Sequence, residues 1–339
     1  MKIVKAIARA IDRRDLARDE TAEVFGEIMD GHATPAQIGG LLVALRAKGE
    51  AIDELVGAAT AMRARATPIA CPSPERGIDT CGTGGDGACT INVSTIAAIL
   101  IAACGGVVAK HGNRAQSSRC GSADVLEALG VAIDAEPAVV ERCLAAANIG
   151  FLFAPKFHAA TRHASGPRKE LGTRTIFNLL GPLTNPANVR HQVVGVYDRR
   201  WCEPMAAALG ALGLRRAAVV HGHSGLDEIE VAGDTHVAYW DGERVQSLTL
   251  SPASFHGSDA EPSELAGGDA AHNATVVREV LAGATLGAPL RAAAMTAALG
   301  LALLDGGLEQ LPLHYSRAIA TTRDGRASRV LERWVEASR

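Results

Sequence analysis

Aromatic residues and net charge of either sign are both scarce in this chain of 339 residues. Phe, Trp and Tyr together make up 4% of the sequence, and the formal net charge is -3. Proteins that bind single-stranded nucleic acid stack the bases on aromatic side chains, and nucleic-acid-binding domains carry a basic surface. The composition therefore disfavours a nucleic acid partner and favours a small molecule.

Cysteine motifs and membrane-targeting signals are absent as well. The seven cysteines include no Cys-x-x-Cys pair and their number is odd, so neither a zinc site nor a disulfide framework is indicated. The N-terminal segment reaches Asp12, Arg13 and Arg14 too early for the apolar core of a signal peptide. No uncharged apolar run is long enough to span a bilayer. The sequence predicts a cytoplasmic protein.

Residues 1–70 carry helical patterns throughout. Apolar residues recur at helical spacing in the first two segments, up to residue 29. The third segment has a capping box of Thr34 and Gln37, and Gly49 ends it. A fourth helix is expected over residues 52–66, so these four helices predict a small helical domain.

From residue 78 onward, short apolar strands alternate with helices, which predicts a mostly parallel sheet with helices on both faces. The expected parallel strands are 78–81, 106–109, 150–154, 191–197 and 217–221. Segments 237–240 and 244–250 flank an Asp-Gly turn and predict an antiparallel hairpin at the edge. The expected helices are 94–104, 122–129 with Ser122 as its N-cap, 137–147, 203–212, 274–281, 290–304 and 316–338, with a loop over 251–269.

A glycine-dense stretch joins the first expected strand to its helix. Four glycines lie within the six residues 82–87, and the polar residues Thr90, Asn92, Ser94 and Thr95 open the helix. Glycines permit close approach of the backbone to a ligand, and the N-terminus of a helix attracts anions. A turn needed only for packing is the alternative, but the pattern favours a phosphate-binding site.

The segment after the second strand decides which phosphate ligand fits. A dinucleotide-binding fold needs an acidic residue there to hold the ribose, whereas Lys110-His-Gly-Asn-Arg114 is basic. A P-loop needs Gly-Lys-Ser/Thr, and the sequence has Asp86-Gly87 instead. A solvated basic loop is the alternative to a ligand site. The position at a strand end favours a heavily phosphorylated ligand held by this basic loop.

Two further groups of residues carry charge suited to ligands. Asp227 and Glu228 follow a strand and a glycine loop, and with Ser94 they could hold Mg²⁺, although adjacent acids are also common on solvated surfaces. Arginines including Arg168 lie on an expected helix near residues 162–174. They could be surface residues, or they could bind a carboxylate.

Together these motifs closely resemble the anthranilate phosphoribosyltransferase family. The resemblance rests on Gly-Thr-Gly-Gly-Asp-Gly (82–87), Asn-Val-Ser-Thr (92–95), Lys-His-Gly-Asn-Arg-Ala (110–115), the stretch 121–130, Arg-Thr-Ile-Phe-Asn-Leu-Leu-Gly-Pro-Leu-Thr-Asn-Pro (174–186) and Gly-Leu-Asp-Glu (225–228). It covers nearly the whole chain. It implies the fold shared with pyrimidine nucleoside phosphorylases: a helical domain over 1–70, completed around 160–190, beside an α/β domain over 75–339. It also implies a homodimer formed through the helical domains.

The resemblance also implies roles for individual residues. The residues implied to hold phosphoribosyl pyrophosphate (PRPP) are Gly82, Gly85, Asp86, Thr90, Asn92, Val93, Ser94, Thr95, Lys110, His111, Gly112, Asn113, Arg114, Ala115, Gln116, Ser117, Ser118 and Ser122. Those implied to face anthranilate are Gly82, Asn113 and Arg168, with Arg168 near its carboxylate and His111 at the entrance. Lys110, Asn113 and Arg168 are the expected catalytic residues, and Ser94, Asp227 and Glu228 the expected Mg²⁺ ligands, with two ions per monomer.

The implied reaction joins anthranilate to the ribose of PRPP in tryptophan biosynthesis, with release of pyrophosphate. The alternatives are a pyrimidine nucleoside phosphorylase of the same fold and a non-catalytic homologue that binds nucleic acid. Three residues depart from the family pattern, namely Pro167 directly before Arg168, Arg119 and Cys120. Pro167 is expected to bend the helix that carries Arg168.

Overall fold

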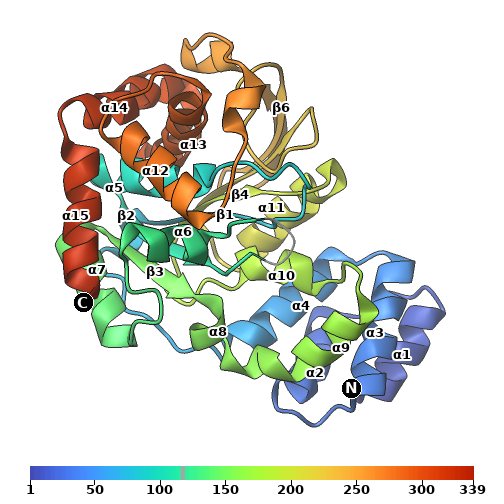
Figure 1. The fold of residues 1–339 in the computed structure, drawn as a ribbon. Helices are drawn as coiled ribbons and strands as arrows, with labels where there is room; N and C mark the ends of the chain where they lie inside the picture. The colour runs from blue at the N-terminus through green and yellow to red at the C-terminus, as the bar shows by residue number, and fades with distance from the viewer. Residues whose placement is uncertain (116–118) are drawn as a thin grey trace.

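A computed structural model describes residues 1–115 and 119–339. The chain forms a group of helices at one end of the molecule and a larger body built around a sheet (Figure 1). The four helices of the N-terminal segment are α1 (Ile3–Ile11), α2 (Arg18–Met29), α3 (Pro35–Lys48) and α4 (Ile52–Arg63). The capping box of Thr34 and Gln37 is present at α3, and α4 ends three residues before the expected Ala66.

Two later helices pack against this N-terminal group. Helix α9 (Arg162–Leu171) contacts α2 and α3, and α10 (Phe177–Leu183) contacts α4. Their apolar side chains Ala164, Phe177 and Leu180 belong to the same buried cluster as Phe25 and Leu41. The segment that carries Arg168 therefore packs as part of the helical group (Figure 1).

The sheet within the described residues has seven strands in the order β3-β2-β1-β4-β5-β6-β7. The strands are β1 (Gly77–Gly82), β2 (Val107–Gly112), β3 (Ile149–Phe153), β4 (His191–Gly195), β5 (Arg216–Gly222), β6 (Thr235–Trp240) and β7 (Val245–Leu250). Strands β1 to β5 pair in parallel, and β6 and β7 form the predicted antiparallel hairpin at the edge. The predicted fold class, a helical domain with a mostly parallel α/β domain, is confirmed.

Helices cover both faces of the sheet because alternate side chains of each strand point to opposite sides. Ala218 and Val220 of β5 join the cluster of α5 (Val93–Ala103) and α13 (Ala288–Asp305), whereas Ala217 and Val219 join the cluster of α11 (Cys202–Ala211). The remaining helices are α6 (Ser122–Leu129), α7 (Pro137–Ala147), α8 (Ala154–Phe157), α12 (Ala270–Leu281), α14 (Leu311–Arg323) and α15 (Arg326–Ser338). Helix α13 is long and apolar enough to cross a membrane, but 83% of its apolar window is buried in this core.

Three expectations about single elements are wrong. Strand β2 continues to Gly112, so Lys110 and His111 lie in the sheet and not in a loop, and both side chains are buried. The N-cap of α6 is Gly121, and Ser122 is its first residue. The expected helix 316–338 is two helices, because Gly325 adopts φ +76° and ends the first one.

The carboxyl ends of the parallel strands lead into the predicted site segments. The glycine stretch follows β1, Asn113 follows β2 and the loop of Asp227 follows β5. Ligands of parallel sheets bind at this edge. The topology thus brings segments far apart in the sequence to one place.

Candidate active site

The glycine turn after β1 contacts the carboxylate of Asp227. Gly84, Gly85 and Gly87 have φ between +63° and +81°, a conformation that other residues rarely adopt. The N–H of Gly84 donates to Asp227 Oδ2 at 2.9 Å, and a Cβ on Gly82 would lie 2.7 Å from the same oxygen. Glycine is therefore required at position 82 for contact with the acidic loop.

Asp227 and Glu228 form an acidic cluster with Asp86. Loss of hydration, with the nearby charge of Asp86, raises the pKa of Asp227 to about 7. Loss of hydration, with the charge of Asp227, raises the pKa of Glu228 to about 8. Glu228 also accepts a hydrogen bond from the Ser94 N–H at the start of α5.

The donor set of this cluster suits Mg²⁺. The raised pKa values of Asp227 and Glu228 show that nearby positive charge does not fully offset their burial and mutual repulsion. Carboxylate and hydroxyl oxygens are ligands that Mg²⁺ prefers. Across residues 1–115 and 119–339, no three His, Cys, Asp or Glu side chains already converge on one point. Water and substrate oxygens would therefore complete the coordination, as is usual for Mg²⁺.

Lys110 lies beneath this cluster. Its side chain is 1% exposed, and its Nζ donates to the Thr80 carbonyl at 2.6 Å and to Ser94 Oγ at 3.2 Å. Burial lowers the pKa of Lys110, and the carboxylates of Asp79 and Glu228 oppose this effect. The ammonium therefore holds Ser94 and places positive charge under the candidate metal site.

A second buried carboxylate, Asp79, holds the strand that carries Lys110. Asp79 Oδ1 accepts from the His111 N–H at 3.1 Å, and Oδ2 accepts from Asn185 Nδ2 at 2.8 Å. Asn185 is itself fixed, because its Nδ2 also donates to the Ala109 carbonyl at 2.8 Å. Burial raises the pKa of Asp79 to about 6, although Lys110 and these hydrogen bonds favour the charged form.

The raised pKa of Asp79 predicts a pH-dependent stability difference. Between pH 3.8, the usual pKa, and about 6, folded Asp79 keeps a proton that the unfolded chain releases. The Asp79 contribution to stability therefore rises as the pH falls. We expect the unfolding free energy of the wild type relative to Asp79→Asn to increase by about 1.4 kcal/mol from about pH 7.5 to about pH 5. Urea unfolding of both proteins measures it.

Comparing the wild type with Asp79→Asn removes the contribution of groups that titrate in both proteins. Burial lowers the pKa of His111 to about 3 and that of His158 to about 4. These two histidines therefore destabilise the wild type and Asp79→Asn equally as the pH falls. A difference that stays constant, or shrinks toward low pH, would contradict the raised pKa of Asp79.

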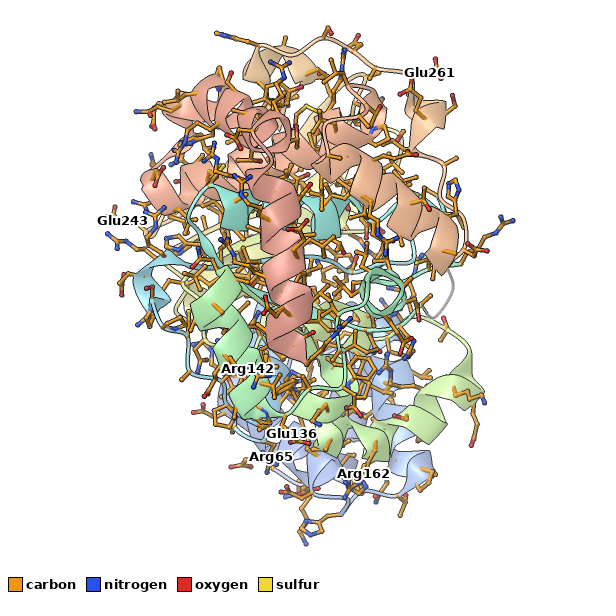
Figure 2. All side chains as sticks on the ribbon, turned by 60° about the vertical axis from the view of Figure 1, so that its left-hand side comes forward. Arg65, Glu136, Arg142, Arg162, Glu243 and Glu261 are labelled. Atoms are coloured by element: carbon orange, nitrogen blue, oxygen red, sulfur yellow. The ribbon has the colours of Figure 1, made fainter. Side chains whose placement is uncertain are left out.

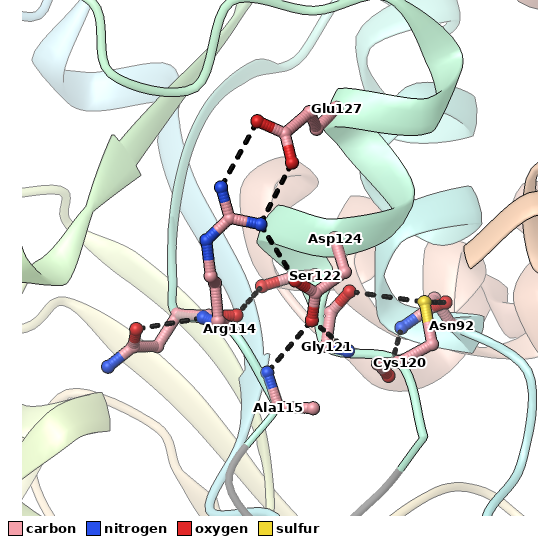
Figure 3. Close-up of polar contacts among 9 residues, drawn as sticks. Asn92, Arg114, Ala115, Cys120, Gly121, Ser122, Asp124 and Glu127 are labelled. Carbon is pink, nitrogen blue, oxygen red and sulfur yellow. Dashed lines mark hydrogen bonds and ion pairs between the residues drawn. The ribbon is translucent and has the colours of Figure 1, made fainter. Parts of the chain in front are cut away.

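Asn92 and Cys120 join the start of α5 to the segment before α6 (Figure 3). Asn92 Nδ2 donates to the Cys120 carbonyl at 3.3 Å, and its Oδ1 accepts from Asn273 Nδ2 at 2.9 Å. The thiol of Cys120 is buried against Asn92 Oδ1, and burial raises the pKa of Cys120 to about 11. Cys120 is therefore a packing residue that orients Asn92.

The segment after β2 is held by acidic residues of α6. Arg114 pairs with Asp124 and Glu127 at 2.9 Å each, and the N–H groups of Ala115 and Gly121 donate to Asp124 (Figure 3). These two carboxylates raise the pKa of Arg114. Its guanidinium is engaged in the protein and does not lie free for phosphate. Gln116, Ser117 and Ser118 lie outside the described residues.

Arg168 is a half-buried cation on α9. Its guanidinium lies 4.8 Å from the ring centre of Phe177, and burial lowers its pKa. Within the described ranges no carboxylate pairs with it and no hydrogen bond from its side chain is found. The preceding Pro167 is buried within the helix and supplies no N–H to it. An unpaired guanidinium of this kind is suited to bind a carboxylate.

Two family models match the chain. The α/β domain of a glycosyl transferase family matches residues 75–328, and the helical bundle domain of this family matches residues 4–66. A protein from Desulfosudis oleivorans, named anthranilate phosphoribosyltransferase, is 48% identical over 332 residues, 98% of this chain and 97% of its own. The chain belongs to the anthranilate phosphoribosyltransferase family.

Solved structures of the family share this fold. Anthranilate phosphoribosyltransferase from Thermus thermophilus matches with a TM-score of 0.92 and 41% identity, over 98% of this chain and 99% of its own. The Saccharomyces cerevisiae enzyme, in complex with PRPP and Mg, matches with a TM-score of 0.90 and 27% identity. The match covers 99% of this chain and 97% of the yeast chain. The same yeast enzyme is also known with 4-fluoroanthranilate, at a TM-score of 0.87 and 27% identity, again over 99% and 97%.

The structure brings together six of the residues that the family resemblance singled out. Around the glycine turn and the start of α5 lie Gly82, Asp86, Ser94, Lys110, Asp227 and Glu228. Thr90 bridges to Ala266, and Asn113 accepts from Ser122 Oγ at 3.3 Å through its carbonyl.

The sequence resemblance placed His111 at the entrance of the anthranilate site, and the structure does not. Its ring is 5% exposed and lies 5.1 Å from the ring of His158. The strand pairing of β2 with β3 places it inside. The imidazole of His111 is buried and neutral, and it packs against His158 instead of lining an entrance.

Sequence reasoning about the site assigned no role to Asp79 and Asn185, and it considered Arg174 only among the arginines of residues 162–174. Asp79 precedes the glycine stretch by three residues, but its partner Asn185 lies 106 residues away. Arg174 donates to the Gly85 carbonyl, a backbone partner that leaves no sequence signal. Both Asn185 and Arg174 do fall inside the family motif 174–186.

Proposed function

We propose that this chain transfers the phosphoribosyl group of PRPP to the amine of anthranilate, giving N-(5-phosphoribosyl)anthranilate and pyrophosphate in tryptophan biosynthesis. The observation that carries the proposal is the glycine turn seated on Asp227, beside Glu228 and the start of α5. That arrangement offers backbone N–H groups to phosphate and oxygen ligands to Mg²⁺.

The chemistry needs alignment more than acid–base catalysis. The aryl amine is neutral at pH 7, so its lone pair can form the C–N bond at C1 of the ribose without a strong base. The C–O bond to pyrophosphate breaks with its electron pair on the pyrophosphate oxygen, and the nitrogen then releases its proton to solvent. Ser94, Asp227 and Glu228 would hold Mg²⁺, which when bound supplies positive charge to the leaving pyrophosphate. We propose two ions per monomer.

The protein side chains would divide the remaining work. Lys110 holds Ser94 and adds a buried positive charge below the leaving group. Arg168 would bind the carboxylate of anthranilate, and Asn113 and Gly82 would line the space where the amine meets the sugar. Near the phosphates we place Gly85, Asp86, Thr90, Asn92, Val93, Thr95, Gly112, Ala115, Gln116, Ser117, Ser118 and Ser122.

Loss of anthranilate fluorescence tests the function directly. The fluorescence should fall only when both PRPP and Mg²⁺ are present. No loss, together with phosphorolysis of thymidine or uridine, would contradict the proposal and support a nucleoside phosphorylase.

We further propose that the enzyme is a cytoplasmic homodimer and that residues 1–70 and about 160–190 form one domain beside 75–339. The packing of α9 and α10 on the N-terminal helices supports this division. All seven cysteines lie among the described residues as free thiols, which supports a reducing compartment.

Two adjacent apolar stripes on the helical group support dimer formation. Val4, Ala8 and Ile11 are exposed on one face of α1, and Gly40 and Val43 are exposed on α3, which packs against α1. Val4 and Ile11 are 60% and 66% exposed. Apolar stripes of this kind mark protein interfaces.

A charge placed in these stripes should separate the subunits. Val43→Glu would bury a carboxylate in the proposed interface, so we expect sedimentation velocity to give a monomer. Leu313→Glu is the control, because Leu313 on α14 is similarly exposed at 53%. A Val43→Glu protein that sediments like the wild type would contradict an interface at this face.

A further inference from the structure

Arg174 connects the segment between α9 and α10 to the glycine turn. Its Nη2 donates to the Gly85 carbonyl, and its Cζ lies 4.0 Å from the ring centre of Tyr197. A Cβ on Gly85 would lie 3.3 Å from the same Nη2. The guanidinium thus lies over the Tyr197 ring and donates a hydrogen bond to the backbone of the turn.

The turn is held at three successive residues. The Thr83 N–H donates to the Gly195 carbonyl at 2.9 Å, and Thr83 Oγ1 accepts from the Tyr197 N–H at 3.0 Å. Gly84 is held by Asp227, as described above. Arg174 supplies the third contact, at Gly85, and Tyr197 takes part in two of these attachments.

The contact at Gly85 sets the direction of the next N–H. In a trans peptide the carbonyl of one residue and the N–H of the next point in opposite directions. Because the Gly85 carbonyl faces Arg174, the Asp86 N–H faces away from Arg174. For residues 1–115 and 119–339, no protein acceptor is found for the N–H groups of Gly85, Asp86 and Gly87. Successive free N–H groups of this kind form an anion-binding nest.

We propose that Arg174 is a positioning residue for PRPP: it fixes the Gly85–Asp86 peptide so that the free N–H groups of the turn point toward the phosphates. Arg174 acts through the backbone and does not touch the ligand. The proposal rests on the proposed function, because it assumes that the turn binds PRPP.

Direct binding separates this role from a structural one. We expect Arg174→Gln to weaken PRPP binding by about tenfold or more in calorimetry with Mg²⁺ and no anthranilate, since a charge-assisted hydrogen bond is lost. The dissociation constant for anthranilate should change by less than about threefold. Arg162→Gln is the matched control, since Arg162 is an exposed arginine on the outer surface of α9 (Figure 2).

Salt dependence separates positioning from direct contact. If Arg174 touched phosphate, the ratio of variant to wild-type dissociation constants would shrink at high ionic strength. A positioning role predicts a constant ratio, and a shrinking ratio would overturn the proposal. Unchanged PRPP affinity in a folded variant with a lower melting temperature would overturn it too, leaving only a structural role.

A second variant covers the case in which Arg174→Gln does not fold. Tyr197→Leu removes the ring that stacks on the guanidinium, and it should weaken PRPP binding in part, whereas Tyr197→Phe keeps the ring and should not. Equal PRPP affinity in the wild type, Tyr197→Leu and Tyr197→Phe would overturn the inference. A wild type that binds PRPP but does not consume anthranilate would instead contradict the proposed function alone.

Discussion

Replacing Asp227 by Asn and Glu228 by Gln together is expected to lower kcat/KM for PRPP by about a thousandfold. Charge stabilisation at a leaving group by a bound metal is worth several kcal/mol, and about 1.4 kcal/mol corresponds to tenfold in rate. Both carboxylates would lose their charge while the loop after β5 keeps its shape. Initial rates measured against Mg²⁺ concentration give the size of the loss and the apparent metal affinity.

The same double substitution should not destabilise the metal-free protein. Burial and mutual repulsion raise the pKa values of both acids, so the neutral amides remove an unfavourable interaction. The melting temperature without Mg²⁺ should therefore stay equal or rise. Asp234→Asn is the matched control, because Asp234 is an exposed acid of the same loop. Unchanged Mg²⁺ dependence in the double variant would show that these acids are not the metal ligands.

Arg168→Ala is expected to raise the KM for anthranilate by about 30- to 100-fold and to change the KM for PRPP by less than about threefold. A hydrogen bond to a charged group contributes about 1.5–3 kcal/mol, and each 1.4 kcal/mol is tenfold in affinity. Arg168 is half-buried and, among the residues described, has no ion pair or hydrogen bond in the protein that the substitution would remove. Steady-state kinetics with each substrate varied in turn measures both constants.

Lys169→Ala is the control for Arg168→Ala, since the neighbouring Lys169 is exposed. Loss of the guanidinium from the Phe177 ring costs about 1 kcal/mol of stability, so the variant should remain folded. Equal increases in the two KM values would remove Arg168 from the anthranilate site.

Local signals in the sequence account for what could be predicted of the fold. The capping box of Thr34 and Gln37 and the Asp-Gly turn of the hairpin are fixed by neighbouring residues, and the structure has both. The break at Gly325 was missed because apolar residues keep helical spacing on both sides of it. One glycine within such a pattern does not reveal whether it adopts a positive φ.

The site was harder to predict where its partners are distant or belong to the backbone. Lys110 was expected in a loop because a charged residue at a strand end is usually solvated. Its burial depends on partners distant in the sequence, among them Asp79 and Thr80. The contacts of Arg174 with Gly85 and of Asn185 with Asp79 depend on the folded topology. Neither pair has a spacing that can be recognised in the chain.

The glycine turn has a consequence for how this protein can be dissected and how it can change. The N–H groups for which the described residues offer no acceptor belong to Gly85, Asp86 and Gly87, and no side-chain exchange other than one to proline deletes a main-chain N–H. Alanine scanning would therefore report strain at the glycines and leave the ligand contacts themselves uncounted. Replacing one amide by an ester through semisynthesis would isolate a single contact. For the same reason, point mutation alone offers evolution few ways to alter the phosphate specificity of this turn without also changing its shape.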